Sequence, residues 1–342
     1  MILKKVSLFF LTVILFAGPV MVYSQKRPGR QITIKLASPV PAKTPWGVAL
    51  DRMASEWSAA TNGEVQMKIY PDGIQGTEAD VLQKLNMNVI QAAVFTSLGL
   101  NKLVPEILTL SCPLLIQNDE ELTAVFDVMK PELEAKINSQ NYYSMALVRG
   151  GWIKIFSKEP VFVPSDLKRM KVGSDPLEPA MMAAFKSMGY QVVPVESNRT
   201  LVALNGVTGI DAIYASPIVS AGMQFFGVAK NMSTINIAPF LGGIVINKHT
   251  WETIPEQHRA AILRITRRIG TEIEISLAQL ESDAINTMTR HGLAINDLNS
   301  RQRQEWYDDL EKALPILLGS VTFDQDTYDK IDRIVKTYRN RR

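Results

Sequence analysis

Residues 32–73 decide the fold class: ITIKLASPVPAKTPWGVALDRMASEWSAATNGEVQMKIYPDG. Apolar residues alternate over 32–36 and again over 65–69, and this two-residue period is typical of strands. The apolar side chains between the two strands recur instead at helical spacing: Trp46, Leu50, Met53 and Trp57. Gly63 ends that helix, and the PDG turn at 71–73 ends the second strand. The stretch therefore predicts a strand–helix–strand unit, the building block of an α/β sheet.

The same alternation of strands and helices continues along the chain. Thr77 and Asp80 mark a helix start, and VIQAAVF (89–95) has the continuous apolar character of a buried strand. Further strands are predicted at 142–149, 152–157, 168–172, 191–195, 210–214 and 241–247. Helices are predicted at 178–188 and at 197–204. This order indicates an open α/β sheet with mostly parallel strands.

One long helical pattern over 255–290 breaks this alternation. Apolar residues recur there at spacings of three and four: Ile262, Ile265, Ile269, Ile273, Leu277, Leu280, Ala284 and Met288. At 1.5 Å per residue, some 35 residues make a rod of roughly 50 Å, longer than a lobe of about 150 residues is wide. Such a helix is expected to brace two lobes, and two or three shorter helices are expected over 300–340.

The composition is that of a globular protein large enough for two lobes. The 342 residues are 46% hydrophobic, 21% charged and 8% aromatic, which excludes a disordered chain. The formal net charge is +3, from 37 basic and 34 acidic residues. Removal of the predicted leader would take away Lys4 and Lys5, which leaves 35 basic and 34 acidic residues and a net charge of +1. This balance lacks the basic footprint of a nucleic-acid-binding protein, so no nucleic-acid partner is expected.

The N-terminus has the pattern of a cleavable leader. Two lysines precede an apolar run over 6–18, and VYS at 22–24 offers small or permissive residues before a cut at Gln25. A membrane anchor is the alternative, but the run is shorter than the roughly 20 residues that span a bilayer. We therefore predict a signal peptide over 1–24, a short lead-in over 25–31 and an exported protein.

The sequence shows no catalytic constellation. The G-x-S-x-G, P-loop, H-E-x-x-H and paired C-x-x-C patterns are absent, so no enzymatic activity, cofactor or metal is predicted. Cys112, the single cysteine, lies in the apolar run 107–116 and is expected in the core. Open α/β sheets bind ligands beyond the carboxyl ends of their strands, and hinged lobes close around them. Capture of a solute is therefore favoured, with an exported enzyme and a structural or chaperone-like protein as alternatives.

Six segments resemble one protein family, in order along the chain. They are YPDGIQGTEADVLQKL (70–85), AAVFTS (92–97), KEPVFVPSDLKRMKV (158–172), MGYQVVPV (188–195), GVTGIDAIYASP (206–217) and VINKHTWETIPEQHRAAI (245–262). Together they are similar to the substrate-binding proteins of TRAP transporters, the DctP family, over nearly the whole mature chain. The resemblance implies the two-lobed α/β fold of periplasmic solute-binding proteins. It also implies a receptor that delivers a small-molecule ligand to TRAP membrane subunits.

The implied fold divides the chain into two lobes. Lobe I is predicted to contain 32–152 and about 236–268, and lobe II 153–235 and about 269–342. The long helix over about 255–290 is predicted to span both.

The chain departs from the family where the family binds a ligand carboxylate. The family's strand carries an arginine that holds the carboxylate through two hydrogen bonds, whereas KV at 171–172 is followed here by Gly173. A second basic position of the family holds Ile153. Burying an unpaired carboxylate is unfavourable, so a neutral or hydrophobic solute is predicted rather than a simple carboxylate. Lys154 or Arg149 could replace the missing arginine, because the sequence leaves open which strand side chain faces the cleft.

The predicted ligand-binding residues are Trp46, Ser97, Trp152, Lys154, Gly173, Asp175, Tyr214, Ser216 and Phe240. Trp152 and Phe240 are expected to supply apolar walls. Ser97, Asp175 and Ser216 are expected to supply polar contacts from loops after strands. Some family members with an altered pocket work with a tetratricopeptide-repeat protein. The absent arginine resembles that group, so such a partner is a further hypothesis.

Overall fold

The computed structural model describes residues 31–207, 209–320 and 323–340. The predicted signal peptide over 1–24 and its cut before Gln25 lie outside these residues. No helix within them is long and apolar enough to cross a membrane.

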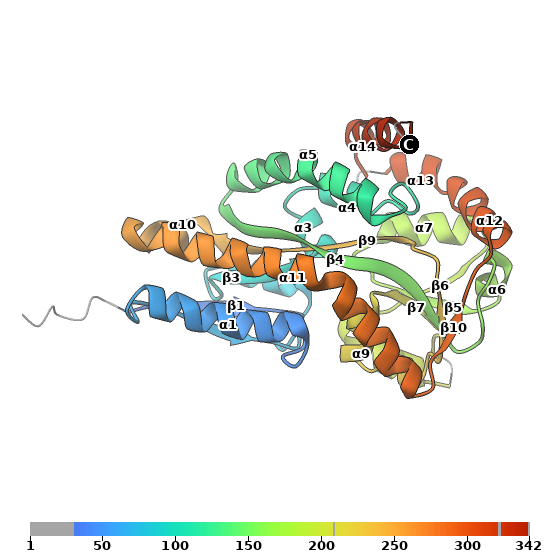
Figure 1. The fold of residues 1–342 in the computed structure, drawn as a ribbon, viewed down its shortest axis with the longest axis horizontal. Helices are drawn as coiled ribbons and strands as arrows, with labels where there is room; N and C mark the ends of the chain where they lie inside the picture. The colour runs from blue at the N-terminus through green and yellow to red at the C-terminus, as the bar shows by residue number, and fades with distance from the viewer. Residues whose placement is uncertain (1–30, 208, 321–322, 341–342) are drawn as a thin grey trace, which may run out of the picture.

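One mixed sheet organises the molecule (Figure 1). Its strands follow the order β2-β1-β3-β9-β4-β7-β5-β6, and β8 and β10 extend it beside β4. The strands are β1 (Ile32–Ala37), β2 (Val65–Tyr70), β3 (Ala92–Thr96), β4 (Tyr142–Ser157), β5 (Lys171–Ser174), β6 (Gln191–Pro194), β7 (Ala212–Ala215), β8 (Asn231–Ser233), β9 (Ala238–Asn247) and β10 (Ala294–Asn296). β1 pairs in parallel with β2 and β3, and β5 pairs in parallel with β6 and β7. β4 and β9 run antiparallel to their neighbours on this path, which gives the predicted α/β sheet an antiparallel centre.

The strand β4 joins two halves of this sheet. Its residues 142–153 pair with β9, which adjoins β3, β1 and β2 and completes what we call the β1 half. Its residues 154–157 pair with β7, which adjoins β5 and β6 in the β5 half. An irregularity in the pairing with β9 falls between Arg149 and Trp152, where the sequence predicts a break. The two strands predicted here are therefore one strand with a local bulge.

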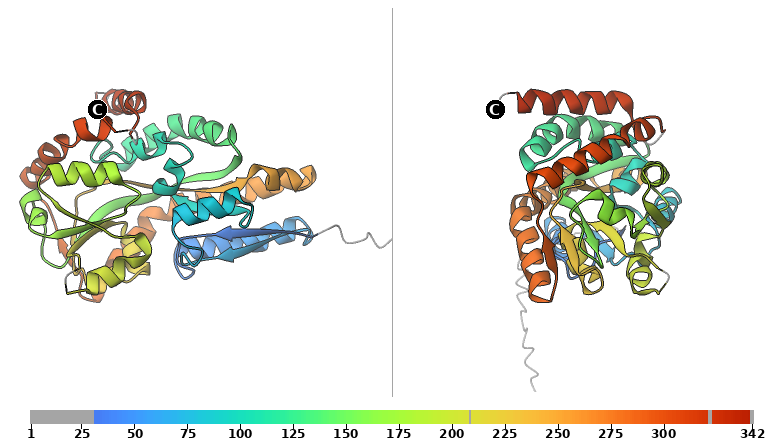
Figure 2. Two further views of the ribbon diagram at one scale, coloured as in Figure 1. Left: turned by 180° about the vertical axis from the view of Figure 1, so that it is seen from behind. Right: turned by 90° about the vertical axis from the view of Figure 1, so that its right-hand side faces the viewer.

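Helices pack on the sheet from several sides (Figures 1 and 2). They are α1 (Pro45–Ala60), α2 (Glu78–Asn86), α3 (Ser97–Asn101), α4 (Glu106–Leu110), α5 (Asp119–Asn138), α6 (Pro164–Lys168), α7 (Pro179–Ser187), α8 (Thr200–Asn205), α9 (Pro217–Gly222), α10 (Lys248–Thr253), α11 (Glu256–Arg290), α12 (Ser300–Glu311), α13 (Leu314–Leu318) and α14 (Gln325–Arg339). The start of α1 is fixed by two residues. The Thr44 hydroxyl accepts a hydrogen bond from the backbone N–H of Gly47 and caps the helix, and Pro45 occupies the first turn. Leu50, Met53 and Trp57 form its buried face, as their spacing predicts.

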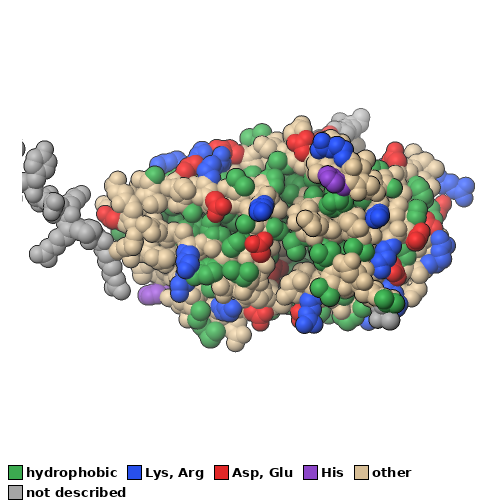
Figure 3. Space-filling model, turned by 90° about the horizontal axis from the view of Figure 1, so that it is seen from below, with side chains coloured by type: hydrophobic (Ala, Val, Ile, Leu, Met, Phe, Trp, Pro, Cys, Tyr) green, Lys and Arg blue, Asp and Glu red, His purple; other side chains and the backbone are tan. Residues whose placement is uncertain are grey.

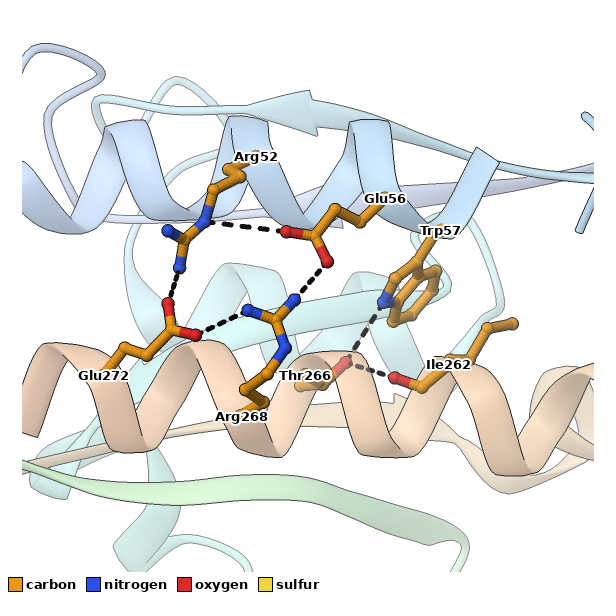
Figure 4. Close-up of polar contacts among 7 residues, drawn as sticks. All are labelled: Arg52, Glu56, Trp57, Ile262, Thr266, Arg268 and Glu272. Atoms are coloured by element: carbon orange, nitrogen blue, oxygen red, sulfur yellow. Dashed lines mark hydrogen bonds and ion pairs between the residues drawn. The ribbon is translucent and has the colours of Figure 1, made fainter. Parts of the chain in front are cut away.

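The 35-residue helix α11 runs along both halves, as predicted (Figure 1). It packs against α1 and β4 and, farther along, against α9. Trp57 of α1 is fully buried, and its indole N–H donates to the hydroxyl of Thr266 on α11 at 3.1 Å (Figure 4). A ring of exposed ion pairs flanks this contact, formed by Arg52, Glu56, Arg268 and Glu272 (Figure 4). A buried hydrogen bond and surface charges therefore fasten α1 to α11.

The C-terminal helix α14 lies along α5 (Figure 2). Glu121 near the start of α5 is only 3% exposed, and both its oxygens accept from the Arg339 guanidinium, at 2.8 and 2.9 Å. This bidentate ion pair closes the chain's C-terminal end over α5. α12, α13 and α14 confirm the short helices predicted over 300–340.

Some elements differ from the sequence-based predictions. The strand predicted over 168–172 begins only at Lys171, because α6 continues to Lys168. α5 is not among the predicted helices, and Pro131 within it obscures the helical pattern. β8 and β10 have three residues each, too few to show a period.

Candidate ligand-binding site

A cavity of about 340 Å³ lies between the two halves of the sheet. Residues that follow β1 and β3 line it from one half, and residues that follow β5 and β7 line it from the other. The strands of the two halves run in opposite directions, because β4 and β9 between them are antiparallel to their neighbours. Their carboxyl ends therefore face each other across the cavity, where open α/β folds bind ligands. The first residues of β9, Ile153 of β4 and side chains of the helices α4, α7 and α9 also contribute to the wall. In the view from below (Figure 3), hydrophobic side chains gather along the middle of the molecule, where the surface is hollowed between the halves.

Most of the cavity wall is apolar. Trp46, from the first turn of α1, and Phe240, from β9, are both half-buried, and their ring centres lie 5.9 Å apart at a tilted angle. Other apolar lining residues come from both halves of the sheet, among them Leu98, Met181, Ile213 and Phe225. Aromatic and aliphatic walls of this kind favour the apolar part of a solute.

The charged residues in the wall are acidic. Glu78 is the first residue of α2, and Thr96 at the end of β3 holds it: the backbone N–H donates to Oε1 at 2.6 Å and the hydroxyl to Oε2 at 2.8 Å. Burial is the main cause that raises the pKa of Glu78, the hydrogen bonds from Thr96 oppose it and the charge of Asp175 adds to it, so that the pKa lies at about 7.

Glu178 occupies the corresponding place in the β5 half, at the start of α7. It is 8% exposed and accepts a hydrogen bond from the hydroxyl of Tyr214 on β7. The Tyr214 oxygen lies 2.8 Å from the Ser174 hydroxyl. Burial raises the pKa of Glu178 to about 7, with a further contribution from Asp175. Burial and the adjoining Glu178 together raise the pKa of Tyr214 well above its usual value, so the phenol stays protonated.

Asp175 is the third acidic residue of the wall, and its charge raises the pKa of both Glu78 and Glu178. Its Oδ1 accepts from the backbone N–H of Leu177 at 2.9 Å, and its Oδ2 accepts from Ser197, from the hydroxyl at 2.6 Å and from the backbone N–H at 3.1 Å. Asp72 is a fourth acidic residue of the lining. No lysine, arginine or histidine is among the lining residues in the described part of the chain.

Seven of the nine predicted site residues lie in the wall of this cavity: Trp46, Ser97, Gly173, Asp175, Tyr214, Ser216 and Phe240. Their binding of a solute stays a prediction. The Ser97 hydroxyl contacts the Leu241 carbonyl at 3.3 Å, and the Ser216 oxygen accepts from Val219 N–H at the start of α9. Both serines therefore already have partners within the protein.

Trp152 and Lys154 are not among the lining residues, in contrast to the prediction. Side chains alternate along β4, so Ile153 faces the cavity while its two neighbours point elsewhere. The Trp152 indole donates to Asp119 at 2.8 Å, at the start of α5. The Lys154 ammonium donates to Asn236 at 2.7 Å, and burial lowers its pKa although Glu281 opposes the shift.

Arg149, the other proposed replacement anchor, is also absent from the lining. Its guanidinium donates to the Thr123 hydroxyl at 2.6 Å and pairs with Glu274 of α11 at 3.5 Å. Because Arg149 is held by α5 and α11, the structure does not bring it to the cavity wall.

Gly173 lies in the wall at the end of β5, at the position where the resemblance implies an arginine. A Cβ atom built on it would lie 2.6 Å from Cδ1 of Ile210, too close for a real contact. Ile210 thus fills the space beside the missing side chain. The position is closed by apolar packing rather than left open.

Sequence reasoning missed Glu78 and Glu178. Acidic residues at helix starts are common because they favour the helix dipole, and this ordinary explanation hid their position. Each follows a strand of the parallel part of the sheet at the beginning of the next helix, which is where open α/β folds bind ligands. The order strand, loop, acidic residue, helix could therefore have identified Glu78 and Glu178 as candidate site residues.

Within 31–207, 209–320 and 323–340, no group of three or more His, Cys, Asp or Glu side chains could hold a metal ion. Cys112 is buried, as predicted, and burial raises the pKa of its thiol to about 12. It therefore acts as a core residue rather than a nucleophile.

A two-lobed α/β fold with a cavity between its halves defines a solute-binding protein of the periplasmic type. The chain belongs to the DctP family, described as bacterial extracellular solute-binding protein family 7, whose sequence model matches residues 36–316. This is the family of TRAP solute-binding receptors that the sequence resembles.

Individual relatives are distant. A solute-binding protein of Sulfitobacter sp. (strain NAS-14.1) is 23% identical over 215 residues, which cover 61% of this chain and 64% of the relative. The C4-dicarboxylate-binding protein DctB of Bacillus subtilis is 22% identical over 307 residues, 85% of this chain and 84% of the relative. The sugar-acid-binding protein DctPAm of Advenella mimigardefordensis, solved with galactonate, matches with a TM-score of 0.82 and 15% identity, over 90% of this chain and 99% of the other. At this identity the structural likeness shows the fold alone.

Proposed function

We propose that this protein is the periplasmic receptor of a TRAP transporter and captures a neutral or hydrophobic solute, rather than a simple carboxylate, between its lobes. The observation that carries the ligand class is the charge of the cavity wall. In the described part of the chain the wall contains four acidic residues and no basic one, among mainly apolar side chains. A carboxylate buried there would have no cation to pair with.

The relatives named for C4-dicarboxylates and sugar acids differ in ligand class from this proposal. The difference is supported by Gly173, which stands where the family resemblance implies a carboxylate-binding arginine. We assign the chain on this ground to the subset that lacks the arginine. A tetratricopeptide-repeat partner, known for some members of that subset, is part of the proposal.

In this mechanism the predicted lobes, 32–152 with about 236–268 and 153–235 with about 269–342, close around the solute. The signal peptide over 1–24 would direct the chain to the periplasm, and the closed form would bind the TRAP membrane subunits. Trp46 and Phe240 would contact the apolar part of the solute. No bond is made or broken in this cycle, which distinguishes the receptor from an exported enzyme.

Calorimetric titration with succinate and galactonate tests the ligand class. We expect no binding of either acid. Binding that weakens with salt and is lost in Lys154→Ala or Arg149→Ala, but not in the control Lys186→Ala on the exposed face of α7, would establish the carboxylate alternative instead. A structural or chaperone-like protein would show no ligand-dependent closure by small-angle scattering.

A further inference from the structure

We propose that the solute carries a basic nitrogen on an apolar body, and that Glu78 and Glu178 select this group from the two halves of the sheet. This inference rests on the proposed function: of its two ligand options it takes the hydrophobic one, and it adds a cationic head group to the apolar body. Glu78 begins α2 in the β1 half, and Glu178 precedes α7 in the β5 half. Both line the same cavity, so a solute held between the halves meets a carboxyl group from each.

Neutral donors, not cations, hold these carboxyl groups. Thr96 donates twice to Glu78, and the Tyr214 hydroxyl donates to Glu178. Asp175 accepts from backbone N–H groups and from the Ser197 hydroxyl. These bonds orient the carboxyl groups and leave their charge uncompensated.

The surrounding charged groups add to this imbalance. Asp175 and Asp72 are the other charged residues of the described lining, and both are acidic. Lys84, on the same helix as Glu78, donates instead to the carbonyl and side-chain oxygens of Gln75 and is not among the lining residues. A cation in the cavity would have to come from the solute. An ammonium group would supply both the charge and the N–H donors that the carboxylates accept.

The acidic wall also explains what the cavity excludes. An organic acid would place its carboxylate near Glu78, Asp175 and Glu178 with no basic side chain in the described lining to offset the repulsion. The aromatic pair of Trp46 and Phe240 would take the apolar body, at 5.9 Å between ring centres. The wall thus selects an amphiphilic amine and rejects the corresponding acid.

The pH dependence separates this idea from its nearest alternative. The pKa of Glu78 and that of Glu178 are each raised to about 7, by burial first and by Asp175 next. An ammonium ligand binds best when both groups are ionised, so its affinity should rise as the pH rises through 7. If the two groups instead stayed protonated and donated to an oxygen of a neutral solute, affinity would fall over the same range.

The test compares n-octylamine, n-octanol and n-octanoate by isothermal titration calorimetry at pH 6 and pH 8. We expect the amine to bind at least about tenfold more tightly than the alcohol at pH 8, the advantage to shrink at pH 6, and the octanoate not to bind. Equal affinity of amine and alcohol would overturn the inference and leave the apolar receptor standing. Tightest binding of octanoate, or no binding of any of the three, would overturn both.

Two matched variants assign the effect to residues. Glu78→Gln and Glu178→Gln keep the size and the accepting oxygen of each side chain while removing its charge. Each should reduce the amine-to-alcohol ratio several-fold, and the double variant should bring it close to one, with the affinity for octanol kept as evidence of a folded cavity. Glu196→Gln, on an exposed side chain outside the lining, is the control and should leave the ratio unchanged. An unchanged ratio in the double variant would contradict the assignment.

Discussion

Thr96 donates to both carboxylate oxygens of Glu78, with its backbone N–H at 2.6 Å and its hydroxyl at 2.8 Å. Thr96 ends β3 and Glu78 begins α2, so this contact holds a carboxyl group at the edge of the sheet where the cavity lies. On the other half, Tyr214 of β7 donates a single hydrogen bond to Glu178, from its hydroxyl. Each half of the sheet therefore holds one carboxyl group of the acidic wall, through a residue of its own strand β3 or β7.

The two cavity carboxyl groups should make stability depend on pH. Their pKa values lie near 7 in the folded protein and at 4.5 ordinarily, so the native state holds protons that the unfolded chain releases over this interval. The free energy of unfolding should fall as the pH rises from 4.5 to 7, by on the order of 1–3 kcal/mol for each group. Urea denaturation of wild type and of the double variant Glu78→Gln/Glu178→Gln at pH 5 and pH 8 measures this. Equal pH dependence in both proteins would show that these carboxyl groups do not carry it.

Gly173→Ala should destabilise the protein, because the added methyl group would clash with the side chain of Ile210. The added Cβ would lie 2.6 Å from Cδ1 of Ile210, so the isoleucine must move. We expect a loss of about 1–2 kcal/mol in the free energy of unfolding. Ile210→Val removes that methyl group, so adding Gly173→Ala to this background should have a much smaller effect. The same loss in both backgrounds would mean that some other contact explains the glycine.

The buried hydrogen bond between α1 and α11 should matter more than the ion pairs beside it. Trp57→Phe removes the donor to Thr266 and leaves space in a fully buried site, so we expect a loss of about 2 kcal/mol. Arg268→Ala removes an exposed member of the charge ring (Figure 4) and should shift the thermal midpoint far less. Thermal unfolding of both variants at low and high salt measures this. A larger drop in the thermal midpoint for Arg268→Ala than for Trp57→Phe would contradict the prediction and show that the surface ion pairs dominate.

The ion pair between Arg339 and Glu121 should stabilise the C-terminal helix. Arg339→Ala leaves a carboxylate that is 3% exposed without its bidentate partner, and we expect a loss of about 2 kcal/mol. Arg333→Ala, on the exposed face of the same helix, is the control and should change stability little. Chemical denaturation curves that coincide for the two variants would show that α14 is held by its apolar contacts alone.

The sequence was sufficient for the elements with a clear period. The strand–helix–strand unit over 32–73 and the long helix α11 lie where their apolar spacing predicts. The helix α5 is not predicted from the sequence, because Pro131 interrupts an otherwise helical stretch. The direction of the side chains along β4 cannot be predicted from the alternation of residues. A bulge between Arg149 and Trp152 changes which side chains face the cavity, and the sequence pattern does not reveal this bulge.

The sequence predicts part of the cavity wall, and the binding of a solute by these residues stays a prediction. Trp46, Phe240 and Tyr214 lie in the cavity wall because each follows or belongs to a strand at the predicted sheet edge. Lys154 points away from it towards Asn236, a difference of one position along β4. Glu178 was missed because an acidic helix start has a simpler explanation in the helix dipole.

Native mass spectrometry of the protein purified without added ligand, followed by solvent extraction, tests the ligand class most directly. We predict a bound molecule with an apolar body and no carboxylate, and a basic nitrogen on it if Glu78 and Glu178 select the head group. A bound dicarboxylate or sugar acid would contradict the proposed function, because the described cavity wall has no basic residue to receive it.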